Sequence, residues 1–540
     1  MSKKIQWTQL EHSGPLFPEE YTPLPKGIHM FYDGKPVVLN STDRNNLFNM
    51  SAEEAAYLYC EVYEREARLS SASSKRESVM DYVFNNNFWN DWFQLTSVHH
   101  PEILYFDKVD FSLLVRYISE VKIDKAETRG MMLPEEKKFQ KAEKQQIKDD
   151  FGYATIDGQL MAIGNFKVQP PGLMIGHKSK QRGQIKKRIQ PSDIIVNGSK
   201  VEGSEWGGKM CDSSVSYLAK YKNNVSKQFV YIHLDRKVSR VVEENDKMKF
   251  DKAKTLGENI SLIRQAYSVD IMSPYLQRQQ LGVALFLLDN IALRPGTEKD
   301  ELTENDTVGL TTLRIENINL LPENKIQFKF FGKSSIEFNK TFKFDSNVYA
   351  RLYSFIVNKS ERDQIFDLVN ANNLNAYIKS IVPGCTAKTF RTWKASSVLQ
   401  KQLFENKVSV DDNLNNKSIA FKTANIKTAL ALNHKKLNQD NEKALLTIQE
   451  AMKKEQAILM DVSSSVAKKQ KAHERLGQLA LSKREKEQNV SIITSKVNYI
   501  DPRIVVAWAK RVEYPIEKIY NASHLQKFRW AVETMSTWTF

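Results

Sequence analysis

A tyrosine in the last part of the chain stands in a polar stretch that also carries two cations. It is Tyr499 in the run Ser495-Lys496-Val497-Asn498-Tyr499-Ile500-Asp501-Pro502-Arg503, and the apolar helical run Ile504-Val505-Val506-Ala507-Trp508 follows it. By itself, a tyrosine before Asp-Pro is typical of a half-buried packing residue whose hydroxyl lies in a turn. Its phenol is also a nucleophile for phosphorus, if the rest of the chain supplies the groups that this reaction requires.

Candidates for those groups are spread widely along the sequence. They are Arg294, Lys333, Arg391 and His434. Attack on a phosphodiester needs cations and hydrogen-bond donors on the non-bridging oxygens of the pentavalent phosphate, and a general acid for the departing oxygen. Because the ordinary pKa of tyrosine is about 10, nearby positive charge must also activate the phenol. The phosphotyrosine product conserves the energy of the broken bond, so resealing needs no ATP.

Each of these four residues also has an ordinary structural explanation. Arg294 closes an apolar helical run and suits the negative end of a helix dipole. Lys333 stands in a tight turn, Arg391 suits a salt-bridged core position, and His434 follows an apolar helical run. Taken singly, the structural explanations are the more common ones. The catalytic interpretation depends on the ordered set.

The bulk composition indicates a large globular protein with an excess of positive charge. The chain has 540 residues, 79 Lys+Arg against 64 Asp+Glu, and a formal net charge of +15. This length predicts two or three domains. The charge favours a polyanionic partner, since neutralising phosphates releases counterions. A charge that only keeps the protein soluble is the alternative.

Several classes of protein are disfavoured by what the sequence lacks. No apolar run of about 18 residues exists, so we expect no membrane-spanning helix. The start of the chain lacks the apolar segment of a secretory signal. The cysteines Cys60, Cys211 and Cys385 are far apart and show no metal-ligand spacing. We therefore expect no zinc site and a reducing compartment.

The pattern along the chain changes at three places, which predicts four segments: 1–237, 238–438, 439–488 and 489–540. The first mixes strand and helix signals, and the second has longer helical patterns with strand-like alternation at 311–315 and 326–330. A tight turn at 331–335 should carry Lys333. Residues 439–488 are rich in Lys, Glu, Gln and Ala, which favours two antiparallel helices in a short coiled coil.

A basic, glycine-flanked segment of the first part is a candidate contact for phosphates. Its cations, with a neighbouring histidine, are His177, Lys178, Lys180, Arg182, Lys187 and Arg188. Glycines beside many cations favour a loop that faces a nucleic acid. An ordinary solvated loop explains the pattern equally well.

Ordered motifs over nearly the whole chain resemble those of the eukaryotic type IB DNA topoisomerases. They are Leu10–Phe17, Tyr21–Pro25, Phe31–Lys35, Ile163–Lys167, Pro170–Leu173, Lys187–Ile195, Ser495–Arg503 and Pro515–Asn521. The resemblance implies an α+β, multidomain clamp. Its parts would be a mixed α/β cap of two subdomains at 1–237, a mainly α catalytic core at 238–438 of the type shared with tyrosine recombinases, a protruding coiled-coil linker at 439–488, and a C-terminal domain at 489–540.

The resemblance also implies a role for each candidate. Tyr499 would form a 3′-phosphotyrosine, Lys333 would protonate the 5′-hydroxyl, and Arg294, Arg391 and His434 would hold the scissile phosphate. Lys496 and Asn498 would contact DNA beside the nucleophile, together with the basic segment described above. Two loops would meet as lips around the DNA, with Lys178, Lys180 and Arg182 facing Glu301 and Glu304.

The implied activity is relaxation of supercoiled double-stranded DNA by a monomer, through a transient single-strand break, without ATP or an obligatory metal. The implied location is the nucleus, or a viral replication site if the source is a virus, although no targeting signal is evident. The alternatives are a site-specific tyrosine recombinase and a non-catalytic, basic DNA-binding scaffold. The cap motifs disfavour the first, and the intact set of five residues disfavours the second.

Two positions depart from the family pattern. His177 stands where the family usually has arginine, and Ser334 stands where it usually has aspartate after the catalytic lysine, whereas Asn498 is retained. Neither position belongs to the catalytic five. We therefore expect the cleavage chemistry to be intact.

Overall fold

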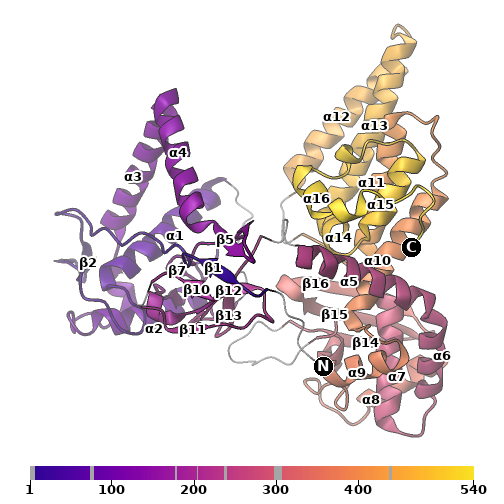
Figure 1. The fold of residues 1–540 in the computed structure, drawn as a ribbon, viewed down its shortest axis with the longest axis horizontal. Coiled ribbons are helices and arrows are strands. Elements are labelled where there is room, and N and C mark those ends of the chain that lie inside the picture. The colour runs from indigo at the N-terminus through magenta and orange to yellow at the C-terminus, as the bar shows by residue number, and fades with distance from the viewer. Residues whose placement is uncertain are drawn as a thin grey trace. The chain divides into compact units, whose positions relative to one another are not determined.

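The computed structural model describes residues 7–72, 78–176, 179–203, 205–235, 240–296, 307–436 and 441–540. These residues form two compact units, unit 1 up to Val241 and unit 2 from Val242 onward (Figure 1). The boundary that the sequence predicts between residues 237 and 238 lies outside the described residues. Within the described ranges, no helix is long and apolar enough to cross a bilayer.

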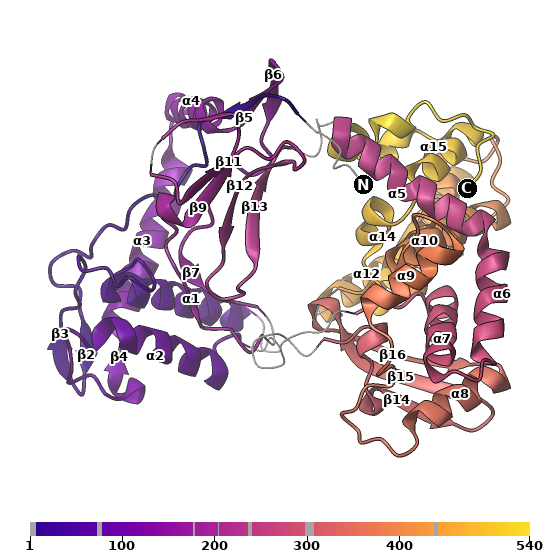
Figure 2. The same cartoon turned by 60° about the horizontal axis from the view of Figure 1, so that its bottom comes forward.

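Unit 1 combines small sheets with helices. Its strands are β1 Leu10–His12, β2 Met30–Tyr32, β3 Lys35–Val37, β4 Val109–Asp110, β5 Tyr153–Ile156, β6 Gln159–Ala162, β7 Gly172–Leu173, β8 Ile185–Lys186, β9 Ile194–Asn197, β10 Lys200–Val201, β11 Gly208–Met210, β12 Tyr217–Lys222 and β13 Phe229–His233. The sheet orders are β10-β1-β5-β6, β11-β9-β12-β13, β3-β2-β4 and β7-β8. The strands of the second and third of these sheets are labelled in Figure 2. The helices are α1 Ala52–Ala72, α2 Tyr82–Thr96, α3 Ser112–Met131 and α4 Pro134–Phe151.

The core of unit 1 is strongly aromatic. Phe84, Phe88 and Trp92 lie on the inner face of α2 and are completely buried, and the rings of Phe88 and Trp92 stack with their centroids 5.8 Å apart. These rings therefore belong to the hydrophobic core of unit 1. In contrast, α4 buries none of its side chains, as expected for a solvated, highly charged helix.

Unit 2 is mainly helical and contains a single sheet among its described residues. Its helices are α5 Arg240–Glu258, α6 Ile260–Ile271, α7 Leu276–Ile291, α8 Ser346–Ile356, α9 Ala371–Ile381, α10 Ala387–Glu405, α11 Leu414–Ala431, α12 Glu442–Met460, α13 Val466–Glu487, α14 Ile492–Asn498, α15 Pro502–Arg511 and α16 Ala522–Lys527. The sheet is antiparallel, with β14 Ile318–Leu321, β15 Lys325–Gly332 and β16 Ile336–Lys343 in that order. Together the two units confirm an α+β, multidomain protein.

One predicted strand is absent. Residues 311–315 alternate like a strand, but Thr311, Thr312 and Ile315 lie in the 3-10 turns Leu310–Thr312 and Ile315–Asn317, and Arg314 forms only an isolated β-bridge with Gln364. Within this segment the backbone N–H of Thr311 donates to the carbonyl of Pro295 and that of Ile315 donates to the carbonyl of Asp363, while the Thr312 hydroxyl accepts from the N–H of Gly309. These tertiary and capping bonds occupy groups that a sheet would require, so they override the local pattern.

The segment around Tyr499 shares a hydrophobic core with α10 and α11. This core includes Leu399, Phe421, Ile500, Val505, Trp508, Tyr520 and Phe528. Helix α15 is strongly amphipathic and buries its apolar face there, since Val505 and Trp508 are at most 4% exposed. Burial of this face therefore holds the turn that carries Tyr499 against α10 and α11.

Helices α12 and α13 form a hairpin (Figure 1). The segment before α12 is hydrogen-bonded to the segment after α13. The backbone N–H of Lys436 donates to the Asn489 carbonyl, and that of Ser491 donates to the His434 carbonyl, both at 2.8 Å. The middle of α13 also packs on α11, where Lys422 donates to the Gln478 side chain. The predicted pair of helices is present, while its coiled-coil geometry stays a prediction.

Candidate active site

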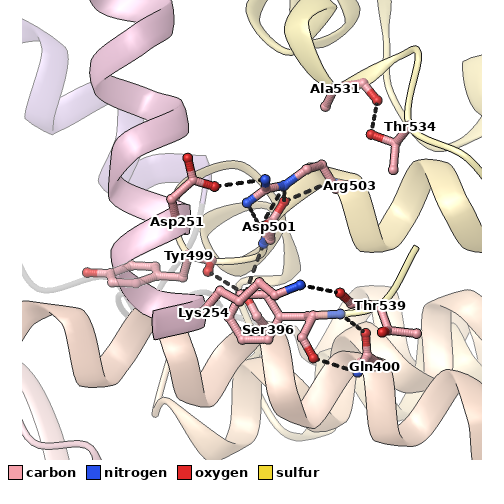
Figure 3. Close-up of polar contacts among 11 residues, drawn as sticks. Asp251, Lys254, Ser396, Gln400, Tyr499, Asp501, Arg503, Ala531, Thr534 and Thr539 are labelled. Carbon is pink, nitrogen blue, oxygen red and sulfur yellow. Dashed lines mark hydrogen bonds and ion pairs between the residues drawn. The ribbon is translucent and has the colours of Figure 1, made fainter. Parts of the chain in front are cut away.

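Tyr499 lies in the turn between α14 and α15. Its backbone N–H donates to the Ser495 carbonyl at the end of α14, and the Asp501 carboxylate caps α15 by accepting from the N–H of Arg503. The hydroxyl of Ser396, on α10, donates to the Tyr499 carbonyl and accepts from the N–H of Asp501 at 3.0 Å (Figure 3). This serine fixes the turn on both sides of the phenol, which is itself half-buried.

A partly buried ion cluster ties the same turn to α5. The guanidinium of Arg503 contacts the Asp501 carboxylate at 2.7 Å and the Asp251 carboxylate at 2.8 Å (Figure 3). Its flat face lies over the rings of Trp538 and Trp530, with centroid distances of 4.7 and 5.5 Å. Because Asp501 is completely buried, removing the guanidinium would leave an uncompensated charge inside the unit.

Two lysines hold the end of α14 from other helices. Lys249 of α5 donates to the Asn498 carbonyl at 3.0 Å, and Lys527 of α16 donates to the Val497 carbonyl at 3.2 Å. The last carbonyls of a helix carry partial negative charge, so ammonium groups are favoured there. These contacts leave the backbone before Tyr499 with little freedom.

Arg391 is buried at the centre of the site and connects its own helix, α10, to the segments that follow α7 and α11. Its Nη1 donates to the Ala292 carbonyl at 2.5 Å, and its Nη2 donates to the Leu432 carbonyl and to His434 Nε2, both at 3.0 Å. Ala292 has a left-handed backbone, with φ of 54°, which turns its carbonyl away from α7. The Arg391 guanidinium carbon lies 5.2 Å from the centre of the Tyr499 ring.

The charge of Arg391 persists despite its surroundings. Burial and the neighbouring charge of Arg294 lower the pKa of Arg391 to about 10. The guanidinium therefore stays protonated at neutral pH. Only 5% of this residue is exposed, so its positive charge acts on the phenol through protein rather than through water.

Arg294 stands shortly after the end of α7, and its charge acts on the same phenol. Its backbone is fixed because the Arg294 carbonyl accepts from Leu310 N–H at 2.7 Å. Gly296 and Gly309 pass so close to each other that a Cβ on Gly309 would lie 2.4 Å from the Gly296 Cα. The side chains of Arg294, Lys333 and Arg391 line one small cavity.

Lys333 stands in the turn between β15 and β16, as predicted from the sequence. Gly332 pairs with Ile336 across the turn, and Lys333 begins the 3-10 turn Lys333–Ser335 between them. The lysine side chain is exposed. A flexible ammonium on a rigid hairpin can reach the rim of the cavity that the two arginines line.

His434 lies just after α11 and is buried against Tyr499. Its ring centroid is 4.9 Å from that of the phenol, and its Nδ1 is 2.6 Å from the Ser495 hydroxyl. Burial and the charges of Arg391 and Arg294 lower the pKa of His434 to about 3. The imidazole is therefore neutral at physiological pH.

Opposing effects set the acidity of the phenol. Burial raises the pKa of Tyr499, whereas the charges of Arg391 and Arg294 and their hydrogen bonds to the phenol oxygen lower it. The net pKa lies below the ordinary tyrosine value. The structure thus brings three of the predicted residues, Arg294, Arg391 and His434, near the Tyr499 phenol, and Lys333 lines a cavity with the two arginines. Such a site can stabilise an attacking phenolate and a phosphate anion together.

Other predicted DNA contacts have different surroundings. Arg188 is 5% exposed, and its guanidinium contacts the Glu54 carboxylate at 2.7 Å and the Glu19 carbonyl at 2.8 Å. It is therefore a structural residue of unit 1, and the predicted phosphate contact there is not supported. Arg182 pairs with Asp81, and Lys187 pairs with Asp193.

The remaining residues predicted to contact DNA or the opposite lip are at least partly exposed or lie outside the described residues. Lys180 and Asn498 are exposed, while Lys496 donates to the Ile519 carbonyl at 2.6 Å. His177, Lys178, Glu301 and Glu304 lie outside the described residues. No group of three or more potential metal-ligating side chains occurs within the described ranges.

Sequence reasoning missed several residues that position the site. Ser495, Asp501 and Arg503 belong to the motif around Tyr499, and their polarity beside an apolar helix was an available signal. Ser396 and Lys249 carried no such signal, because each acts only through tertiary contact with the tyrosine turn.

The close approach of Gly296 and Gly309 predicts a substitution that damages the site selectively. In Gly309→Ala the new Cβ would meet only backbone atoms, including the Arg294 carbonyl at 3.0 Å. Arg294 should move, and single-turnover DNA cleavage should fall by roughly 10²–10³, as when a transition-state donor is lost. Gly130→Ala on α3 is the control, since its Cβ meets nothing within 4 Å. A wild-type cleavage rate in folded Gly309→Ala protein would contradict the prediction.

The charges around the phenol predict a shifted pH dependence. Arg294 favours the ionised form of Tyr499, so Arg294→Gln should raise the Tyr499 pKa and move the rising limb of the single-turnover cleavage rate to higher pH. The control Lys510→Gln also removes a positive charge, but this ammonium donates to the Val532 carbonyl. An identical midpoint in wild type and Arg294→Gln would exclude this activation by charge.

Sequence comparison matches three successive segments of the chain to domains of one protein family. Residues 5–234 match the family described as eukaryotic DNA topoisomerase I, DNA binding fragment. Residues 238–469 match eukaryotic DNA topoisomerase I, catalytic core, and residues 473–540 match the C-terminal topoisomerase domain.

Similar curated proteins extend along almost the whole chain. The mitochondrial DNA topoisomerase I of Rattus norvegicus is 34% identical, over 98% of this chain and 91% of the relative. That of Homo sapiens is 34% identical over 98% and 90% of the two chains. DNA topoisomerase 1 of Homo sapiens is 33% identical over 98% and 71%. With the matching domains and the gathered site, these similarities show that the chain belongs to the eukaryotic DNA topoisomerase I family.

Proposed function

We propose that this protein relaxes supercoiled double-stranded DNA by cutting one strand, allowing controlled rotation, and resealing the strand. The observation that carries this proposal is the position of the Tyr499 phenol, which lies against Arg391 and His434 and whose pKa the charges of two arginines lower. The scaffold alternative would need a broken site, and the residues of this site are all present.

In the cleavage step, the Tyr499 oxygen attacks the scissile phosphorus and forms a 3′-phosphotyrosine. Arg294, Arg391 and His434 hold the non-bridging oxygens, where negative charge accumulates in the transition state. Lys333 gives its proton to the departing 5′-oxygen, since an ammonium on a hairpin turn can follow that atom. Resealing is the reverse: the 5′-hydroxyl attacks the phosphotyrosine and returns its proton to Lys333.

The proposed chemistry draws on no ATP and no obligatory metal. Exchange of one phosphodiester for another conserves the bond energy, and the arginines supply the positive charge that a metal ion supplies in other phosphoryl-transfer enzymes. Lys180, Lys496 and Asn498 are proposed contacts to the DNA around the break, because they lie at or near the surface or beside the nucleophile.

The two units are proposed to act as a clamp around duplex DNA. Unit 1 would be the cap, and unit 2 would carry the site, including the C-terminal residues from 489 onward. The hairpin of α12 and α13 would lie near the DNA downstream of the break and slow its rotation. Its closed base, which joins His434 to Ser491, supports a second role as a tether for the Tyr499 segment. We propose a nuclear monomer.

Relaxation of a negatively supercoiled plasmid in EDTA tests the function. The wild-type protein should relax it completely, whereas Tyr499→Phe, which lacks only the attacking oxygen, should bind the plasmid without relaxing it. Denaturant-trapped protein should carry DNA on Tyr499 through the 3′-end of the cut strand. A covalent adduct on another residue, or relaxation by Tyr499→Phe, would refute the proposal.

The proposed lip contact is testable in the same assay at increasing salt concentration. If Glu304 pairs with cations of the opposite lip, Glu304→Lys should open the clamp more readily, so that processive relaxation ends at a lower salt concentration. Glu517→Lys makes the same charge change in the C-terminal part of unit 2 and serves as the control. Equal salt dependence of wild type and Glu304→Lys would count against the lip contact.

A further inference from the structure

The hydrogen bonds of His434 define which ring nitrogen carries its proton. The nearest donor to Nε2 is Arg391 Nη2 at 3.0 Å, and a guanidinium can only donate. Nε2 must therefore be the acceptor, with its lone pair towards Arg391. The proton of the neutral ring consequently lies on Nδ1, where the Ser495 hydroxyl accepts it at 2.6 Å.

In this tautomer Nε2 has no proton, so it cannot donate a hydrogen bond to a phosphate oxygen. Non-bridging phosphodiester oxygens carry no proton and only accept hydrogen bonds. In the proposed function His434 contacts such an oxygen, and this inference rests on that function. Nε2 is the ring nitrogen next to Arg391, which lies beside the Tyr499 ring. If Nε2 contacts the scissile phosphate, it must therefore carry a proton.

Protonation of both ring nitrogens is the less favourable route to that state. His434 is 4% exposed and lies beside two guanidinium groups. Burial and these charges disfavour a third cation in the same place. The ring can remain neutral if its single proton moves from Nδ1 to Nε2.

Ser495 has the chemistry that this exchange requires. A hydroxyl is both donor and acceptor, and it can rotate about its C–O bond. It can therefore accept from Nδ1–H in the free protein and donate to bare Nδ1 after the exchange. A carboxylate or a backbone carbonyl at this place would only accept, and would hold the proton on Nδ1.

We propose that Ser495 is a positioning residue that lets His434 exchange tautomers when the scissile phosphate replaces Arg391 at Nε2. The protons balance: water takes one from Nδ1 and delivers one to Nε2, and the Ser495 hydroxyl turns its own proton towards Nδ1. The same serine also accepts, through its backbone carbonyl, from the N–H groups of Tyr499 and Ile500 at 3.0 Å. One residue thus links the orientation of the histidine to the position of the nucleophile.

Nitrogen-15 NMR of the histidine side chains tests the exchange directly. The Tyr499→Phe protein, labelled in its nine histidines, is compared alone and bound to a duplex oligonucleotide, and the His434 signals are identified by their loss in Tyr499→Phe/His434→Asn. Free protein should show Nδ1 protonated and Nε2 bare, and the complex should show the reverse. The same tautomer in both states, or two protonated nitrogens in the complex, would overturn the proposal.

Substitutions give a second, independent measurement. Ser495→Ala should lower single-turnover cleavage and resealing by roughly 10-fold, the worth of about one net hydrogen bond, with unchanged DNA affinity. Ser495→Thr keeps the hydroxyl and should restore most of the rate. The matched control is Thr428→Val, which removes another fully buried hydroxyl, one that donates to the Ala424 carbonyl of its own helix.

The outcomes separate this inference from the proposed function. If wild-type protein relaxes plasmid DNA but Ser495→Ala cleaves at the wild-type rate, the positioning role is wrong and the function stands. The positioning role is also wrong if folded Ser495→Thr is as slow as Ser495→Ala. If wild type does not cleave DNA at all, the proposed function itself fails.

Discussion

The buried guanidinium of Arg391 connects the parts of the site that the chain order keeps apart. It donates to the carbonyl after α7, to the carbonyl after α11, and to the imidazole of His434, while its face lies near the Tyr499 ring. Removing a cation from water is costly, and these acceptors offset part of that cost. None of them is an anion, so the positive charge itself remains largely uncompensated. A centre of this kind favours a bound phosphate and an ionised phenol, and it disfavours a protonated histidine.

The remainder of unit 2 keeps the nucleophile within reach of that centre. The Tyr499 turn is held by a serine on α10, by lysines on α5 and α16, and by the Arg503 ion cluster. These contacts come from several directions, which restricts the turn more than any one helix could. Such preorganisation matters because a phosphoryl transfer loses rate steeply when the attacking atom is displaced. The C-terminal tryptophan at position 538 belongs to this support, since it covers the guanidinium of Arg503.

Local patterns in the sequence predicted elements well where one interaction dominates. The apolar run before Arg294, the turn at Lys333 and the amphipathic helix after Tyr499 are all present, because hydrophobic periodicity and turn chemistry decide them. The pattern failed at residues 311–315, where backbone bonds to Pro295 and Asp363 and a threonine cap replace strand pairing. It also failed at Arg188, whose basic neighbourhood suggested a phosphate but whose guanidinium lies against Glu54. Charge along a sequence does not show whether an opposite charge is folded against it.

By itself, the sequence determined the residue types of the site, their order and the family to which the chain belongs. A phenol, two guanidiniums, an ammonium and an imidazole have fixed chemical abilities, which can be read before any fold is known. Only the tertiary structure decided their states: a lowered Tyr499 pKa, a neutral His434 and a proton on its Nδ1. Those states follow from burial and from charges a few ångströms away. The groups responsible are distant in the chain and become neighbours only when it folds.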